Sequence, residues 1–272
     1  MQISITHEAT YPCEPTARSP LLLLRLMPSR FDAQHVLRWH IECGEAGRLR
    51  AAEDAFGNHV HIFSGDGPLE QVQFSISGEV ETFDQAGVVR NAPERLPPAV
   101  FLRQTPATEP DADIRAFARD VAAAGGSDQL GTLHALMRAL HQRLPVAAAE
   151  PRATAQAAFE EKTATARDHA HILVGAARSL DWPARFVSGY RLDDADGQAA
   201  HTMHEWAEVM VADYGWIGFD SAHDICPTDR YVRLAVATDY DGAAPVVGTK
   251  AGADQTVNLT VRAAAALSQT QS

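Results

Sequence analysis

Alternation of apolar and polar residues marks the chain up to about residue 104. This period of two predicts β-strands, because successive side chains of a strand point to opposite faces of a sheet. Turn-forming residues interrupt the pattern at 54–58 and at 64–68. Several short strands separated in this way predict a β-sandwich. We expect its strands at residues 2–7, 21–27, 36–43, 59–64 and 72–80.

Five prolines fall between residues 92 and 111. Proline stiffens the backbone and cannot donate a hydrogen bond to a neighbouring strand, so this stretch is the best candidate for a linker. We therefore predict two domains, a β-sandwich at residues 1–104 and a second domain that begins at residue 105.

The hydrophobic period becomes helical past the linker. The last of the expected helices has an N-cap candidate in Thr163 or Thr165, and it carries an acid, Asp168, in its first turn. We expect helices at residues 112–124, 131–144 and 166–180.

Three further strands are expected after these helices, at 185–191, 205–211 and 216–220, the last two joined by a short turn. The second domain, residues 105–262, should therefore be α+β, with a helix packed on an antiparallel sheet and a C-terminal β extension. The alanine-rich end, residues 263–272, should be a disordered tail.

The composition is that of an ordinary globular protein, with 46% apolar and 21% charged residues. A formal charge of −12 without a dense Lys/Arg cluster excludes a nucleic-acid partner. The most apolar early run, residues 21–24, is too short to span a bilayer, and no signal peptide is evident. Cys13, Cys43 and Cys226 form no CxxC pair, which favours free thiols. We expect a cytoplasmic protein without a cofactor or a membrane partner.

The start of the third helix, a histidine and an acid on later strands are the parts of a site that activates a thiol. A helix N-terminus stabilises a thiolate, a histidine removes and returns the proton, and a carboxylate fixes the histidine tautomer. In a hairpin with a turn of roughly four residues, residue 204 pairs near residue 221. His204 and Asp220 should therefore lie side by side.

Four segments support this interpretation, and in this order they resemble the bacterial transglutaminase-like superfamily. They are ARDHAH at 166–171, FVSGY at 186–190, HEWAEV at 204–209 and GWIGFD at 215–220. Residues 54–58, 96–98 and 105–106 resemble the β-rich N-terminal region of one bacterial branch, and residues 231–262 resemble that branch's C-terminal continuation. The resemblance covers nearly the whole chain and implies a papain-like transglutaminase core after the β-sandwich.

The family carries a cysteine at the start of its Cys-x-Asp-x-Ala-His stretch, which falls on Ala166 here. The resemblance implies a catalytic triad of that thiol, of His204 as base and then acid, and of Asp220 as the orienting carboxylate. Asp168 has a structural interpretation too, because the helix dipole favours an acid in a first turn. The candidates for substrate binding are Arg167, Asp168, Tyr190 and Glu205.

Alanine at position 166 has no nucleophilic atom, so the chain as it stands should form no acyl-enzyme. Either a cysteine was replaced deliberately, or the protein is a natural pseudoenzyme that binds peptide ligands. We expect an engineered inactive variant, because His204, Asp220, Asp168 and His171 all remain. With a cysteine at 166 we expect hydrolysis of a peptide, isopeptide or amide substrate. Acyl transfer to an amine, as in a transglutaminase, is the alternative, and homo-oligomerisation stays open.

Five histidines, at positions 169, 171, 201, 204 and 223, raise the alternative of a metal hydrolase. His169 and His171 are two residues apart on the expected helix and point to different faces, unlike an i, i+4 ligand pair. We therefore expect no metal. We expect packing roles for His171, Trp206, Trp216 and Phe219, and an unreactive thiol at Cys226.

Overall fold

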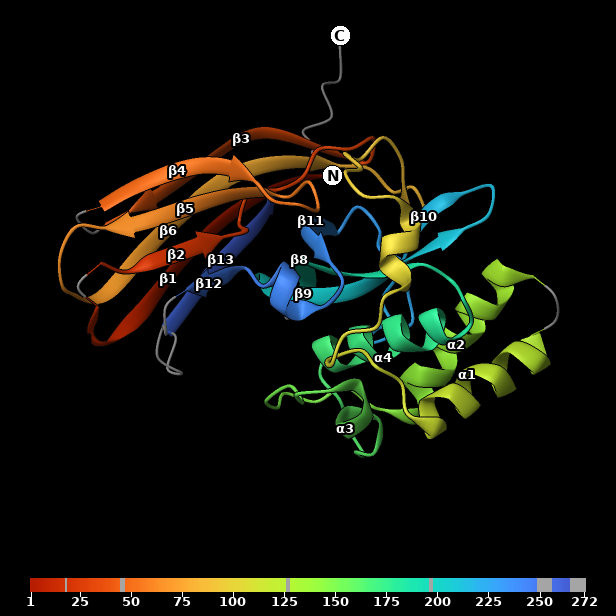
Figure 1. Ribbon diagram of the computed structural model, residues 1–272. Helices are drawn as coiled ribbons and strands as arrows, with labels where there is room; N and C mark the ends of the chain where they lie inside the picture. The colour runs from red at the N-terminus through yellow and green to blue at the C-terminus, as the bar shows by residue number, and fades with distance from the viewer. Residues whose placement is uncertain (18, 45–46, 126–127, 196–197, 249–255, 265–272) are drawn as a thin grey trace, which may run out of the picture.

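The computed structural model describes the chain except for residues 18, 45–46, 126–127, 196–197, 249–255 and 265–272. The tail expected at 263–272 lies outside the described residues, apart from Ala263 and Ala264, which end the last strand. The described strands form two four-stranded sheets and one five-stranded sheet. The longer helices lie together on one side of the molecule (Figure 1).

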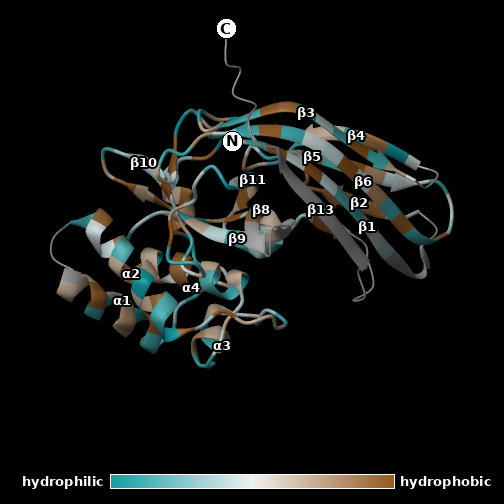
Figure 2. Cartoon of the chain, turned by 180° about the vertical axis from the view of Figure 1, so that it is seen from behind, coloured by the Kyte–Doolittle hydropathy of each residue, from teal (hydrophilic) through white to brown (hydrophobic). Residues whose placement is uncertain are grey.

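The two four-stranded sheets form the β-sandwich that the sequence predicts, with strand orders β13-β1-β6-β3 and β12-β2-β5-β4. Their inner faces share one core, to which Ile3 and Ile5 contribute from one sheet and Leu22 and Leu24 from the other. Figure 2 shows apolar and hydrophilic residues alternating along β3, β5 and β6. The strands are β1 (Gln2–Ala17), β2 (Leu21–Leu24), β3 (Gln34–Cys43), β4 (Gly47–Glu53), β5 (His59–Gly65), β6 (Leu69–Thr82), β12 (Val246–Gly248) and β13 (Thr256–Ala264).

The third sheet is antiparallel, in the order β11-β8-β9-β10-β7, and carries the longer helices on one face (Figure 1). Leu136 of α2 and Leu173 of α4 share a core with Val209 and Phe219 of this sheet. The helices expected from the sequence are all present. The elements are β7 (Val88–Val89), β8 (Ala184–Ala195), β9 (Gln198–Val211), β10 (Gly215–Phe219), β11 (Tyr231–Ala237), α1 (Ala112–Gly125), α2 (Gln129–Arg143), α3 (Ala155–Phe159), α4 (Ala166–Ser179) and α5 (Tyr240–Ala243).

The sheets do not follow the order of the chain. β12 and β13, near the C-terminal end, join the sandwich, whereas β7, which precedes the proline-rich stretch, pairs with β10 in the other sheet. Strands β12 and β13 of the C-terminal β extension that we attached to the second domain therefore lie in the sandwich, whereas β11 pairs with β8 in the other sheet. Alternation predicts a strand but not its partner. The domain boundary at residue 104 stays a prediction. Strands on both sides of it pair with the other part, since β7 joins the sheet that carries the helices, and β12 and β13 join the sandwich.

The proline-rich stretch is packed against the α+β part. Residues Pro98–Leu102 form a 3-10 helix, η1, and Phe101 within it is buried. The guanidinium of Arg178 on α4 donates to the carbonyl oxygen of Phe101 (2.9 Å) and to the hydroxyl of Thr108 (2.8 Å). The predicted linker, residues 92–111, therefore packs against the α+β part, and we call it the strap.

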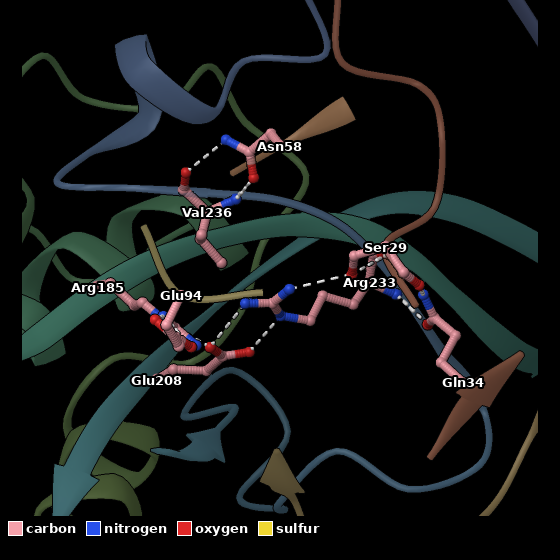
Figure 3. A network of polar contacts seen from close by, with 8 residues as sticks. All are labelled: Ser29, Gln34, Asn58, Glu94, Arg185, Glu208, Arg233 and Val236. Carbon is pink, nitrogen blue, oxygen red and sulfur yellow. Dashed lines mark hydrogen bonds and ion pairs between the residues drawn. The ribbon is translucent and has the colours of Figure 1, made fainter. Parts of the chain in front are cut away.

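A buried polar network joins a loop of the sandwich to the sheet that carries the helices (Figure 3). Glu208 of β9 accepts hydrogen bonds from Nε of Arg185 on β8 (2.7 Å) and from Nε of Arg233 on β11 (2.8 Å). Arg233 also donates from Nη1 to the Ser29 hydroxyl (3.0 Å) and from its backbone N–H to Oε1 of Gln34 (2.7 Å). Three core strands and the loop between β2 and β3 are thus held together.

The charges of this network are paired. Arg185 reaches Glu94, near the start of the proline-rich stretch, with 3.0 Å between Nη1 and Oε2. Burial alone would raise the pKa of Glu208, but its two arginine partners lower that pKa to about 2. Farther along β11, the Asn58 side chain exchanges two hydrogen bonds of 2.8 Å with the backbone of Val236 (Figure 3).

Candidate active site

Helix α4 begins at Ala166 and is fixed there by a reciprocal cap. The Thr165 hydroxyl accepts the backbone N–H of Asp168 (3.2 Å), and the Asp168 carboxylate accepts the backbone N–H of Thr165 (2.9 Å). The other oxygen of Asp168 accepts the backbone N–H of Arg152 (2.7 Å). This capping box satisfies donors that a helix start leaves free. Asp168 is buried and engaged on both oxygens, which favours its structural role, and its contact with substrate stays a prediction.

Arg167 ties the helix start to strand β9. Its Nη2 lies 3.4 Å from Oε1 of Glu205, the residue that follows His204. Its guanidinium also stacks on the ring of Tyr240, 3.3 Å from the ring centre. The side chains of Arg167 and Glu205 are 27% and 14% exposed, so both reach the surface beside the helix start. Their contact with substrate stays a prediction.

His169 ties the same turn to the end of β10. Its Nε2–H donates to the carbonyl oxygen of Leu144 (2.8 Å), and its Nδ1 accepts a hydrogen bond from the Ser221 hydroxyl (3.3 Å). Burial lowers the pKa of His169, which favours the neutral ring that this pattern needs. Because Ser221 directly follows Asp220, the first turn of α4 is anchored beside both strands of the predicted site. Ala166, which opens that turn, is partly exposed.

The two side chains predicted to lie side by side are in hydrogen-bond contact. Nε2 of His204 is 2.7 Å from Oδ2 of Asp220. β9 and β10 pair up to Ala207 and Phe219, so the contact forms just beyond the end of the ladder. His204 is 4% exposed and Asp220 is 1% exposed, so little water weakens their interaction.

Oδ2 of Asp220 accepts two further hydrogen bonds. Nδ1 of His223, in the turn after β10, lies 3.0 Å away, and the hydroxyl of Tyr231, at the start of β11, donates over 2.7 Å. Oδ1 accepts the backbone N–H of Ala222 (3.0 Å). Burial alone would raise the pKa of Asp220, but His204 and His223 hold it well below its usual range. The carboxylate is therefore ionised.

An ionised carboxylate only accepts hydrogen bonds, and this decides where the protons of both imidazoles lie. His204 carries a proton on Nε2, so a neutral ring would present Nδ1 as a proton acceptor. His223 carries a proton on Nδ1. An imidazole held by a buried carboxylate is the arrangement that a catalytic triad requires of its histidine.

Tyr190 does not line a cleft. It is fully buried, belongs to the sandwich core and forms a 2.8 Å hydrogen bond between its hydroxyl and Nδ1 of His7 on β1. This burial argues against substrate binding by Tyr190, which stays a prediction. The motif placed this residue at the end of β8, but the sandwich covers that part of the strand.

Of the histidines that raised the metal alternative, His204 and His223 are the two described ones that lie close together. His171 packs on Phe186, and its Nε2 accepts the backbone N–H of Tyr240 (3.1 Å). Burial lowers the pKa of His171 to about 4. The side chain of His201 lies outside the described residues. Among those described, His204, Asp220 and His223 bring their nitrogen and oxygen atoms within 4.8 Å of one another, close enough to meet around a cation.

Sequence analysis missed the contact of His223 and Tyr231 with Asp220. The signal for His223 is its place three residues after Asp220 in a turn, where side chains of i and i+3 can meet. Tyr231 had no local signal, because β11 pairs with β8 and not with β10. Trp206 is buried, as expected of a core residue, and its ring stacks on His204 at 6.3 Å between centres.

Cys226 is a poor candidate for a nucleophile. It is partly buried in the loop after the last strand of the hairpin. Burial, with the carboxylates of Asp224 and Asp84 nearby, raises the pKa of its thiol to about 11. A thiol with so high a pKa is protonated at neutral pH and a poor nucleophile.

Two family models match the chain. Residues 115–221 match the transglutaminase-like superfamily, and residues 3–81 match the bacterial transglutaminase-like N-terminal region. The chain belongs to the transglutaminase-like superfamily. The segments ARDHAH, HEWAEV and GWIGFD, with Ala166, His204 and Asp220, all fall within the first match.

A solved structure shares the fold of this transglutaminase-like protein. A crystal structure from Cytophaga hutchinsonii, named a "Putative Cysteine Protease", has a TM-score of 0.72 at 17% identity, over 96% of this chain and 89% of that one. At this identity the likeness shows the fold alone, and that fold is the predicted β-sandwich with a papain-like α+β core. The periplasmic domain of TgpA from Pseudomonas aeruginosa reaches a TM-score of only 0.41 at 12% identity, over 81% of this chain and 90% of that one, too low to support an argument.

A curated relative of this transglutaminase-like protein is known by sequence. Uncharacterized protein ML0607 of Mycobacterium leprae (strain TN) is 31% identical over 90 residues, which are 32% of this chain and 32% of that protein. The match thus spans about a third of the relative's length.

In the part of the chain that the structure describes, no helix has both the length and the apolar character needed to cross a bilayer.

Proposed function

We propose that this chain carries the active site of a cysteine-dependent hydrolase of peptide, isopeptide or amide bonds, with residue 166 as the nucleophile position. The main support is the His204–Asp220 hydrogen bond of 2.7 Å, which leaves Nδ1 of His204 as a base. The start of α4 is anchored beside both residues, and a thiol there would gain from the helix dipole.

A cysteine at 166 would give its proton to Nδ1 of His204 and attack the carbonyl carbon of the scissile amide. Backbone N–H groups at the start of α4 would stabilise the oxyanion. The C–N bond then breaks, and the imidazolium gives its proton to the leaving amine. Water attacks the thioester in a second round, passes a proton to Nδ1 and releases the acid and the thiol.

With a methyl group at 166 no covalent step is open, so in our proposal this chain stops at substrate binding. The base and its carboxylate are assembled as a single Cys→Ala replacement would leave them, which supports a deliberate replacement. The coding sequence of the native gene at this codon tests that origin. A natural alanine would favour instead a protein that binds peptide ligands without catalysis.

The Ala166→Cys variant tests the proposal. We expect it to hydrolyse peptide or isopeptide substrates and to be alkylated by iodoacetamide at residue 166, whereas the Ala166 chain does neither at that position. His204→Ala in the Ala166→Cys background should lower the rate by about a hundredfold or more. An alkylated but inactive Ala166→Cys protein, across a panel of amide and isopeptide substrates, would contradict the hydrolase proposal.

Acyl transfer to an amine is the alternative reaction of the same thioester. Hydrolysis is the first reaction to assay, because the structural relative from Cytophaga hutchinsonii is named as a protease. Adding a primary amine to the Ala166→Cys assay separates the two reactions by product mass. An amide product in excess over the free acid would show a transferase.

Metal-dependent hydrolysis is a competing class, because His204, Asp220 and His223 bring three candidate atoms within 4.8 Å. It makes the opposite prediction for the unmodified chain, since a metal site needs no thiol at 166. Activity of the Ala166 protein that a chelator abolishes would favour this class over the thiol mechanism.

A further inference from the structure

We infer that His223 and Tyr231 are positioning residues for His204, and that they act by holding the Asp220 carboxylate in one orientation. Their effect is to keep the His204 proton on Nε2 and Nδ1 free as the base. The inference rests on the proposed function and adds two side chains to the triad that the family resemblance implies.

Three donors converge on a single oxygen of Asp220. Oδ2 accepts from Nε2 of His204 (2.7 Å), from Nδ1 of His223 (3.0 Å) and from the hydroxyl of Tyr231 (2.7 Å). These donors come from β9, from the turn after β10 and from β11. Rotation of the carboxylate would therefore break contacts to three separate parts of the fold. It would also break the bond from the backbone N–H of Ala222 to Oδ1 (3.0 Å).

The same side chains pack around the His204 ring. The ring centres of His223 and Tyr231 lie 5.0 Å and 5.9 Å from that of His204, and the ring of Trp206 stacks on it at 6.3 Å. A flip of the imidazole would exchange Nε2 with Cε1 and lose the bond to Asp220. Hydrogen bonding and packing thus favour one ring orientation and one tautomer.

His223 is not needed to shape the turn that carries it. The backbone of Asp220 forms two hydrogen bonds with that of Ile225, from N–H to oxygen over 2.9 Å and in the reverse direction over 3.2 Å. The side chain of His223 is 31% exposed, so it contributes little to a core. The hydrogen bond from His223 to Asp220 is therefore better explained by a role in orienting the His204–Asp220 pair than by a contribution to the stability of the fold.

The test uses the Ala166 protein as it stands, labelled with 15N at histidine. We expect an Nε2–H tautomer for His204, read from the 15N shifts of its two ring nitrogens. His223→Leu removes a donor to Asp220, whereas His223→Asn keeps an N–H near the position of Nδ1. Tyr231→Phe removes one hydroxyl and keeps the ring. His223→Leu and Tyr231→Phe should populate a second tautomer or ring orientation of His204, and His223→Asn should preserve the original one.

A second readout uses the same variants in the Ala166→Cys background. The rate of alkylation at residue 166 should fall about fivefold with His223→Leu or Tyr231→Phe, as loss of one hydrogen bond predicts, and recover with His223→Asn. His134→Leu is the matched control, since the His134 ring packs on Phe219 at 5.5 Å between centres. It should leave both readouts unchanged.

Two results would overturn the inference. One is a His204 spectrum that is the same in all variants. The other is equal loss of the tautomer in His223→Leu and His223→Asn, which would indicate a packing effect. The tautomer is measured without any reaction, so failure of the Ala166→Cys protein to hydrolyse amides would count against the proposed function and not against this inference.

Discussion

At residue 166 a methyl group stands where our proposal needs a thiol. In that proposal His204, held by Asp220 over 2.7 Å, is the base, and the thiol of Cys226, whose pKa is raised to about 11, is too weak a nucleophile to act instead. A single side chain thus separates binding from catalysis in our proposal. A residue of a family motif need not belong to the site. Asp168 caps helix α4, and Tyr190 is bonded to His7 in the sandwich.

Tyr190→Phe tests this difference at the residue scale. The change removes the hydroxyl bonded to Nδ1 of His7 (2.8 Å) in a buried place. A buried polar group left without its partner costs about 1–3 kcal/mol, so we expect the free energy of unfolding to fall by that amount. Chemical denaturation measures it. Tyr214→Phe, at a side chain on the surface, is the control and should show no change.

A role for Tyr190 in substrate binding predicts otherwise. Tyr190→Phe in the Ala166→Cys background would then raise KM while stability stays the same. We expect KM to stay within twofold.

At the scale of elements, the start of α4 is the part that the site depends on most. Its cap, its ion pair to β9 and its hydrogen bond to the end of β10 all fall within the first turn. A helix end is free to fray unless such contacts hold it. The cap therefore serves the position of residue 166 as well as the stability of the helix.

Thr165→Ala should lower the free energy of unfolding by about 1–2 kcal/mol, because it removes the N-cap acceptor of α4 and half of the capping box. Denaturant unfolding gives this value. Thr154→Ala removes the N-cap of the five-residue helix α3 and should cost less. An equal loss in both variants would show that the α4 cap has no special weight.

At the scale of the whole molecule, the network around Glu208 connects the sandwich to the sheet of the candidate site (Figure 3). Two strands from the C-terminal part complete the sandwich, and a strand from the N-terminal part extends the other sheet. The sandwich and the α+β part are thus joined in three ways. Each contains strands from the other's part of the chain, the strap packs between them along the sequence, and buried ion pairs connect them. We expect them to unfold together, in a single transition.

Glu208→Gln tests the network through its pH dependence. The folded-state pKa of Glu208 is about 2, against an ordinary value of 4.5. A lowered carboxylate pKa adds stability above the unfolded value and loses it as pH falls through the folded one. The variant should therefore be less stable by about 3 kcal/mol at pH 7. The difference should shrink as pH falls from 4.5 toward 2.

Urea unfolding at a series of pH values measures this difference. Glu53→Gln is the control, because Glu53 forms its ion pair with Arg95 at the surface; surface pairs contribute little, and we expect no measurable effect. If the free energies of unfolding of Glu208→Gln and of the original chain differed by the same amount from pH 7 to pH 3, the lowered pKa of Glu208 would be contradicted.

The three longer helices, most of the strands and the order of the motifs could be predicted from the sequence, because hydrophobic period, caps and turn residues act over a few neighbouring positions. The elements β4, β7 and α3 were not predicted. The pairing of His204 with Asp220 followed for the same reason, since one short hairpin carries both. The resemblance to the family, and the prediction that Ala166 falls on its nucleophile position, also came from the sequence.

Only the tertiary structure decided which distant segments meet. It placed β12 and β13 in the sandwich, brought Tyr231 of β11 to Asp220 and buried Tyr190 against His7. Each of these contacts joins residues far apart in the chain, and local periodicity carries no information about the partner of a strand. The sequence by itself therefore determined most of the elements and the candidate site residues, whereas strand pairing and burial decided which side chains meet at that site and which lie in the core.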